Sequence, residues 1–128
     1  MEITIKLNEQ HIEDVFVTAI EGGSNYWFDF NYKDVAEVRR VCEEDNYRDS
    51  LCMQIYYAVF RKGLKLPVYD DWSEEQIGVL DVTNFGERLQ NCMDNHPEAI
   101  YNTLFENGDA NDADIIFQYL CMNELVYG

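Results

Sequence analysis

The sequence predicts an α+β fold: a mostly helical single domain over residues 1–128, with five to six helices and a small sheet of short strands that includes both termini. Three observations predict it. A chain of 128 residues can form one core but is too short for two ordinary domains. Its apolar content of 47%, with nine Tyr and seven Phe, argues against disorder. Apolar residues recur at helical spacing along most of the chain and alternate only in short stretches.

The first elements are a strand and a helix. The stretch EITIKL at 2–7 alternates apolar and polar residues, which predicts a strand. Asn8 can then cap a helix. Its apolar residues form one stripe, namely Ile12, Val15, Phe16, Ala19 and Ile20. We expect this helix to end at Gly22 and Gly23, which permit a left-handed C-cap.

Apolar stripes predict further helices along the rest of the chain. They are expected at residues 35–42, 49–62, 85–93 and 97–105, followed by a last helix from Asp109 or Asn111 to about Cys121. Gly63 ends the second of these ranges, and Pro97 suits the first turn of the fourth. The last helix has acidic residues in its first turn, where the helix dipole favours them.

Short extended segments lie between the helices. They are YWFDF at 26–30, LKLPVYDDW at 64–72, IGVLDV at 77–82 and ELVYG at 124–128. Pro67 argues against a central position for the second of them, because proline cannot donate a ladder hydrogen bond. We expect ELVYG to pair with EITIKL and to bring the two ends of the chain together.

The sequence shows neither a membrane signal nor a metal signal. No apolar run approaches the ~20 residues that span a bilayer, and the first residues lack a basic segment followed by an apolar one. We therefore expect a cytoplasmic protein. Without a C-x-x-C pair, and with only His11 and His96 to assist, the four cysteines predict buried thiols and no zinc site. They are Cys42, Cys52, Cys92 and Cys121.

Two further chemistries are disfavoured. The stretch NGDANDADIIFQ at 107–118 resembles a calcium loop, but Asp112 or Asp114 occupies the position that needs glycine. No serine lies in a nucleophile-elbow context, and neither histidine belongs to a triad motif. We expect no enzyme activity, no metal and no cofactor.

Charge is the strongest signal in the sequence. The net charge is −16. Residues 65–128 carry thirteen acidic residues, against only Lys65 and Arg88. Such a field repels nucleic acids and anionic membranes and attracts basic protein surfaces. The alternative is that the charge serves solubility alone.

One acidic segment contains an aromatic residue. In YDDWSEEQ, four carboxylates surround Trp72, from Asp70, Asp71, Glu74 and Glu75. Clustered carboxylates can present a spacing comparable to the ~3.4 Å between phosphates of one DNA strand, and a tryptophan can anchor an interface. We take these five residues as the candidate partner-binding site. The alternative is a solvated loop whose tryptophan folds inward.

The glycine pair in EGGSNYW at 21–27 raises a second candidate. A phosphate-binding loop places its glycines before a helix, whereas these follow one. The stretch therefore favours an architectural role. A small-ligand site in which Tyr26 and Trp27 stack on a nucleotide stays as the alternative. It needs a local basic cluster, for which the candidates are Lys33, Arg39, Arg40 and Arg48.

Two motifs carry a family resemblance. VFVTAIEGGSNYW at 15–27 and DADIIFQYLCMNELVYG at 112–128 resemble a family of small, functionally unassigned phage and prophage proteins. That family has a V-T-A-x-E-G-G-x-x-Y-W motif near its start and a Q-Y-x-x-x-x-E-x-V-Y-G motif at its end. The resemblance covers thirty residues and implies a viral source, with action in the host bacterial cytosol.

Charge and resemblance together predict a phage-encoded, non-catalytic inhibitor of a host defence nuclease, such as an anti-CRISPR protein. It would mimic nucleic acid and bind a basic nucleic-acid-binding protein of the host, without contacting nucleic acid or membrane itself. One alternative is a binder that sequesters a nucleotide immune signal. Another is a phage structural or host-takeover protein. We expect a monomer or a homodimer.

Overall fold

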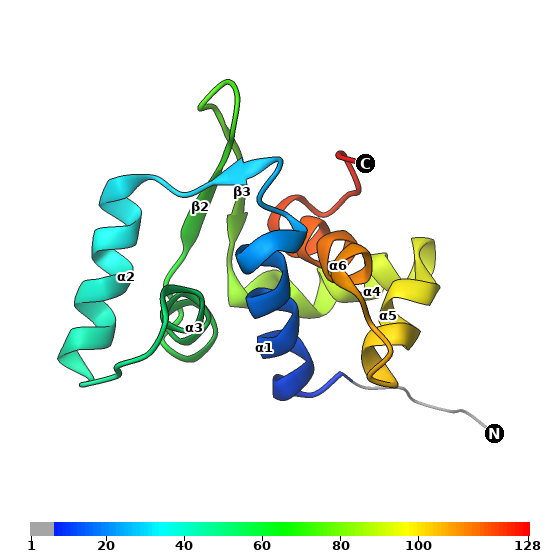
Figure 1. Ribbon diagram of the computed structural model, residues 1–128, viewed down its shortest axis with the longest axis horizontal. Helices are drawn as coiled ribbons and strands as arrows, with labels where there is room; N and C mark the ends of the chain where they lie inside the picture. The colour runs from blue at the N-terminus through cyan, green and yellow to red at the C-terminus, as the bar shows by residue number, and fades with distance from the viewer. Residues whose placement is uncertain (1–6) are drawn as a thin grey trace.

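The computed structural model describes residues 7–128, and Figure 1 shows how their helices surround a small sheet. The helices are α1 (Glu9–Thr18), α2 (Tyr32–Glu44), α3 (Leu51–Tyr56), α4 (Phe85–Asn95), α5 (Pro97–Leu104) and α6 (Ala110–Met122). Short helical turns extend α1 through Ala19–Gly23 and α3 through Tyr57–Arg61, and another spans Val82–Asn84. The strands are β1 (Phe28–Asp29), β2 (Leu66–Asp70) and β3 (Gln76–Leu80). The predicted mostly helical α+β class is confirmed.

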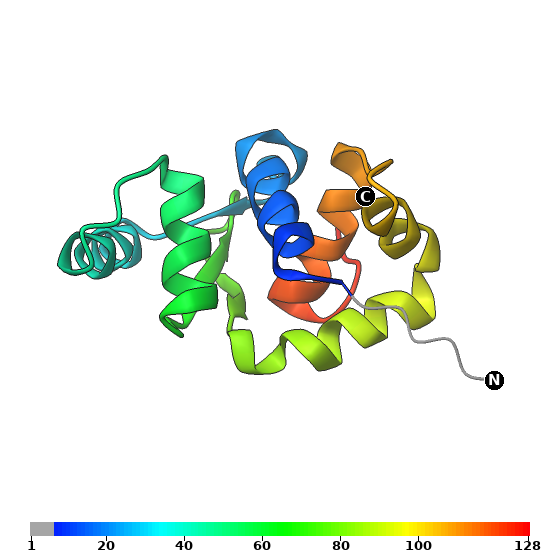
Figure 2. The ribbon, with the colours of Figure 1, turned by 90° about the horizontal axis from the view of Figure 1, so that it is seen from below.

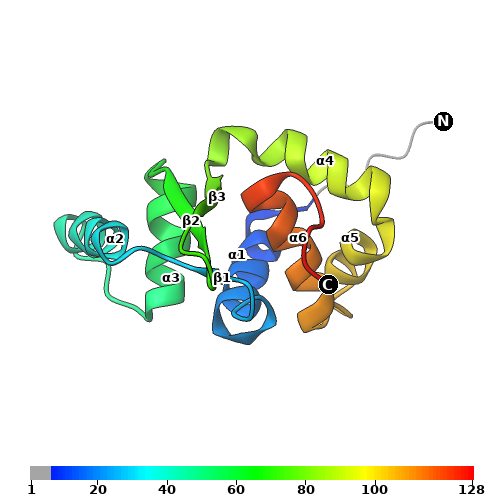
Figure 3. The same cartoon turned by 90° about the horizontal axis from the view of Figure 1, so that it is seen from above.

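Figures 2 and 3 show α2 and α3 at one end, α5 at the other, α1 and α6 between them, and α4 running along one side from β3 toward α5. Residues from all these elements form one core, in which Phe16 of α1 packs edge-on against Phe117 of α6. The four cysteines are free and buried, as the sequence predicts. The described residues contain no helix that is both long enough and apolar enough to cross a membrane.

The sheet is antiparallel with the order β1-β2-β3. Phe28 lies opposite Asp70, and Leu66 lies opposite Leu80. The expectation that Pro67 keeps its strand from the centre is wrong, because β2 is the middle strand. The position is tolerated because β1 pairs only with the end of β2, so that Pro67 faces a strand on one side alone.

The expected strand at 124–128 is absent, which corrects the prediction that the sheet includes both termini. The side chain of Gln118 explains why no strand forms here. Gln118 Oε1 accepts the backbone N–H groups of Val126 and Tyr127, both at 2.9 Å, and Gln118 Nε2 donates to the carbonyl of Tyr127 at 2.9 Å. One glutamine thus satisfies backbone groups that a strand would have paired. The expected strand partner at 2–7 lies almost entirely outside the described residues.

The N-terminal caps of α1 and α6 lie at residues that the sequence predicts as caps. Asn8 and His11 form a reciprocal capping box at the start of α1, and Asp109 and Asp112 form another at the start of α6. Gly63 ends the α3 segment with φ of 72°, which glycine adopts without strain.

The left-handed C-cap expected at Gly22 and Gly23 is wrong, because neither glycine has positive φ. The segment instead continues as a wider helical turn that ends at Ser24. Gly23 is needed for a different reason. A Cβ there would lie 2.9 Å from the backbone oxygen of Ala110, so glycine allows the start of α6 to approach closely.

Candidate functional site

The β2–β3 hairpin projects beyond the rest of the chain (Figure 1). Residues 71–75, which we call the hairpin tip, join its two strands. Trp72 lies in this tip with its surface 90% exposed, so the alternative of an inward-folded tryptophan is wrong. Asp71, Glu74 and Glu75 are also exposed, and no Lys or Arg within residues 7–128 forms an ion pair with them.

Asp70 organises this tip. Its Oδ1 accepts the backbone N–H groups of Trp72 and Ser73, both at 2.8 Å. Its own N–H donates to the carbonyl of Glu75 at 2.8 Å, and its carbonyl accepts the N–H of Glu74 at 3.0 Å. An aspartate that bonds the following backbone in this way fixes a turn. The tip therefore has a defined shape.

The second carboxylate oxygen of Asp70 accepts the hydroxyl of Tyr127 at 2.7 Å. Hydrogen bonds from the Ser73 N–H, the Tyr127 hydroxyl and the Trp72 N–H lower the pKa of Asp70 to about 2. Its carboxylate therefore joins the turn to the end of the chain. That the five candidate residues bind a partner stays a prediction, in which Asp70 positions the other four.

A hollow of about 330 Å³ lies beside the tip end of the hairpin. It is lined by the end of β1 and the two residues that follow, by the end of β2 and by the tip, namely Asp29, Phe30, Asn31, Tyr69, Asp70, Asp71 and Glu74. Four carboxylates and two aromatic rings thus share one concave surface. Carboxylates and aromatic faces are both groups to which arginine and lysine side chains bind.

The alternative ligand site at Tyr26 and Trp27 is mostly internal. Trp27 is only 2% exposed, and its ring stacks on Tyr127 with centroids 5.2 Å apart. It therefore cannot stack on a ligand, which corrects that prediction. Tyr26 is 50% exposed, but its hydroxyl donates to Asp114 Oδ2 at 2.5 Å. Burial of the side chain and, to a smaller extent, the hydrogen bond to Asp114 raise the pKa of Tyr26 to about 12.

Three side chains of this segment, those of Ser24, Tyr26 and Trp27, converge on Asp114, a carboxylate that is 5% exposed. Its Oδ1 accepts Ser24 Oγ at 2.6 Å, Trp27 Nε1 at 2.8 Å and Gln118 Nε2 at 3.3 Å. A buried carboxylate is stable only with such partners. The two sequence motifs, far apart along the chain, therefore meet at Asp114 and hold the fold together.

The four basic residues that a nucleotide ligand would need do not gather around Tyr26 and Trp27. Arg40 is paired with Glu37 and Glu44, both at 2.5 Å. Arg39 and Arg48 line a separate hollow of about 340 Å³, and Lys33 is not among the residues that line it. This hollow lies between α2 and α3 and includes neither Tyr26 nor Trp27.

Residues 7–128 contain no group of three or more metal-binding side chains. Within the same range every buried side-chain nitrogen and oxygen has a hydrogen-bond partner.

Asp114 is the residue that sequence reasoning missed. The sequence places it in the rejected calcium loop and near the start of the last helix, and its partners Ser24 and Tyr26 lie 90 and 88 residues away. The single available signal was its place inside the second motif.

Comparisons of the chain with protein-family models, curated proteins and solved structures find no match.

Proposed function

We propose that this chain is a non-catalytic binding protein that occupies a basic nucleic-acid-binding surface of a host defence nuclease. The observation that carries the proposal is Trp72, which is 90% exposed at the end of a projecting, hydrogen-bonded hairpin. Burying a tryptophan removes roughly 150–250 Å² from water, and at about 25 cal/mol per Å² this contributes several kcal/mol to an interface. Three carboxylates, of Asp71, Glu74 and Glu75, surround it, and none of them pairs with a Lys or Arg of residues 7–128.

The charge distribution supports a basic partner. Beyond Lys65 the chain has one basic residue, Arg88, and its guanidinium Nη1 donates to the carbonyls of Val79, Leu120 and Cys121 instead of to a carboxylate. This one guanidinium is thus bound to backbone carbonyls, and the exposed acids of the hairpin tip, Asp71, Glu74 and Glu75, face solvent. Such a field accelerates association with a basic surface and makes it sensitive to salt.

The narrower proposal of a phage-encoded anti-CRISPR protein in the host cytosol rests on the two motifs and on the charge. A nucleotide-sequestering protein is less well supported, because Trp27 is buried and Arg40 is paired. A thermal-shift screen with linear and cyclic nucleotides separates the two functions. A clear rise in the melting temperature would favour the nucleotide binder.

Capture from a bacterial lysate tests the leading proposal. The immobilised chain is exposed to the lysate at rising NaCl concentrations, and bound proteins are eluted with duplex DNA. We expect nucleic-acid-binding proteins that are released by DNA and by salt. If no such protein is captured at low salt, or if DNA fails to release it, the proposal is wrong.

A further inference from the structure

Residues 123–128 fold back over the end of α6 and are held there by polar bonds. Asn123 turns the chain with φ of 62°, and Asn91 Nδ2 donates to its carbonyl at 3.0 Å. The fully buried Gln118 then binds the backbone of Val126 and Tyr127 through three hydrogen bonds. Val126 itself is half exposed, whereas the ring of Tyr127 packs against the core, so this segment is attached by apolar contact at Tyr127 as well as by the polar bonds.

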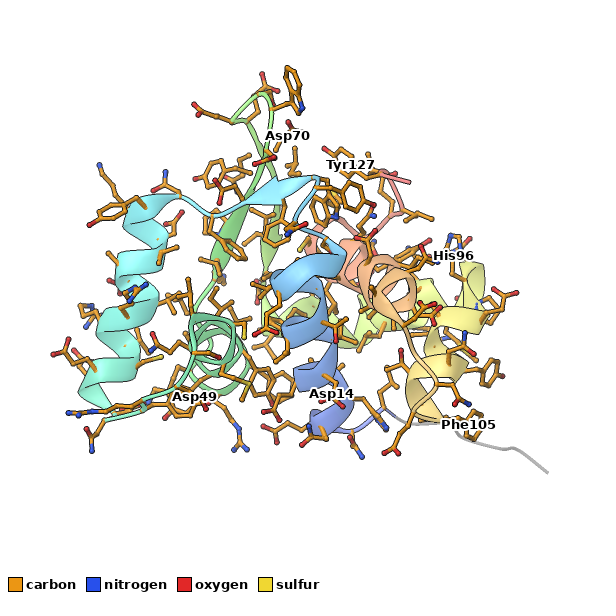
Figure 4. The ribbon with its side chains drawn as sticks, in the orientation of Figure 1. Asp14, Asp49, Asp70, His96, Phe105 and Tyr127 are labelled. Carbon is orange, nitrogen blue, oxygen red and sulfur yellow. The ribbon has the colours of Figure 1, made fainter. Side chains whose placement is uncertain are left out.

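Tyr127 connects this segment to the hairpin. Figure 4 shows Tyr127 and Asp70 side by side, and the hydroxyl donates to Asp70 Oδ2 at 2.7 Å. The Tyr127 ring stacks on Trp27 at an interplanar angle of 11°. The carbonyl of Trp27 in turn accepts the N–H of Asp71 at 3.0 Å. Tyr127 is thus connected to the hairpin tip by two sets of contacts, one through Asp70 and one through Trp27.

We propose that residues 123–128 act as a strap that fixes the direction of the hairpin tip, with Tyr127 as the positioning residue. The bonds run from Gln118 through Tyr127 to Asp70, and from Asp70 to the backbone of Trp72 and Ser73. Preorganising the tip lowers the entropy lost on binding. The consequence for partner binding rests on the proposed function, whereas the ordering of the tip does not.

Tyr127→Phe tests the strap while keeping the ring that stacks on Trp27. Its matched control is Tyr57→Phe, which removes a hydroxyl bonded to Asp45 Oδ2 at 2.8 Å, far from the hairpin in the α2–α3 region. Backbone ¹⁵N relaxation reports the order of the amides at residues 71–75. We expect their order parameters to fall from about 0.85 toward 0.6 in Tyr127→Phe and to stay unchanged in Tyr57→Phe.

Carboxyl ¹³C titration gives a second readout. The pKa of Asp70, about 2 in the intact protein, should rise in Tyr127→Phe because one hydrogen bond to the charged form is lost. A deletion of residues 126–128 should disorder the tip further. If the tip stays equally ordered in both altered chains, there is no strap.

An octa-arginine peptide serves as the basic probe for binding, measured by fluorescence anisotropy at low salt. We expect Tyr127→Phe to bind it at least threefold more weakly than Tyr57→Phe, although the two have equal charge. Equal affinities would overturn the positioning role. If neither the intact chain nor the variants bind the probe while the tip still loses order in Tyr127→Phe, the strap stands and the proposed function fails.

Discussion

Asp114 is an acidic residue that the fold uses internally. It is 5% exposed, and it accepts hydrogen bonds from Ser24, Tyr26, Trp27 and Gln118. The sequence predicts an architectural role for residues 21–27 but does not show which partner they contact, since no local pattern links residues about ninety positions apart. Two predictions concern single residues.

Asp114→Ala should destabilise the protein severely. It leaves the hydroxyl of Ser24 and the indole N–H of Trp27 buried without an acceptor. Because each such donor costs roughly 1–3 kcal/mol, we expect a loss of about 3 kcal/mol or more in the free energy of unfolding, measured by urea denaturation. Asp14→Ala is the control. Asp14 is exposed, so its replacement should change stability by less than about 0.5 kcal/mol. Equal losses would contradict the role of Asp114.

The two neighbouring glycines should respond differently to alanine. At Gly23 the added Cβ meets the Ala110 backbone oxygen at 2.9 Å, and we expect a destabilisation of about 1–3 kcal/mol. At Gly22 nothing lies within 4 Å of that Cβ, and φ is not positive. Gly22→Ala should therefore be neutral or stabilising, by up to about 1 kcal/mol. Thermal unfolding of both variants checks this, and a larger loss at Gly22 would contradict it.

The hairpin is the element that carries the candidate site, and Asp70 joins it to the strap. The sequence predicts both strands of the hairpin and the acids around Trp72. It does not predict that Asp70 differs from its neighbours, because that difference depends on the Tyr127 hydroxyl and on the turn geometry. The expected strand at 124–128 failed for a related reason, since Gln118 takes the backbone bonds of that segment.

Asp70 makes the stability of the protein depend on pH in the acidic range. Its pKa is lowered to about 2 in the folded protein, against about 3.9 in an unfolded chain. Its contribution to stability is therefore complete above pH 4 and is lost as the pH falls toward 2. Asp70→Asn keeps an acceptor for the turn but cannot titrate. The melting temperature of the intact protein should thus fall more steeply than that of Asp70→Asn between pH 4 and pH 2. Parallel curves would contradict this role.

At the scale of the whole molecule, the basic residues are concentrated toward α2 and α3, and four of the eight within residues 7–128 form ion pairs. Arg40 binds Glu37 and Glu44, Arg61 binds Glu9, Lys62 binds Asp45 and Lys65 approaches Asp81. These four cations neutralise carboxylates on their own side of the molecule, within a net charge of −16. The overall excess and its uneven distribution along the chain are visible in the sequence, whereas the pairing depends on the fold.

A net charge of this size destabilises a folded chain through self-repulsion. Sodium chloride screens that repulsion, with a Debye length of about 10 Å at 0.1 M and about 3 Å at 1 M. We expect the melting temperature to rise between 0.01 M and 0.5 M NaCl at neutral pH. A fall over this range would show that the salt bridges around α2 and α3 outweigh the repulsion.

The most direct measurement of the central claim compares the affinity of three variants for a captured nucleic-acid-binding partner at one fixed salt concentration. Trp72→Ala removes the exposed ring, and a triple lysine replacement reverses Asp71, Glu74 and Glu75. The control reverses three exposed acids of α4 and α5, which are Glu87, Asp94 and Glu98.

All three variants should keep a melting temperature near that of the intact protein, because exposed charges contribute little to stability. We expect Trp72→Ala and the tip reversal each to weaken binding by tenfold or more, and the control reversal, with the same change in net charge, to weaken it much less. If the control reversal weakens binding as much as the tip reversal, or if Trp72→Ala binds as tightly as the intact protein, the hairpin tip is not the binding site.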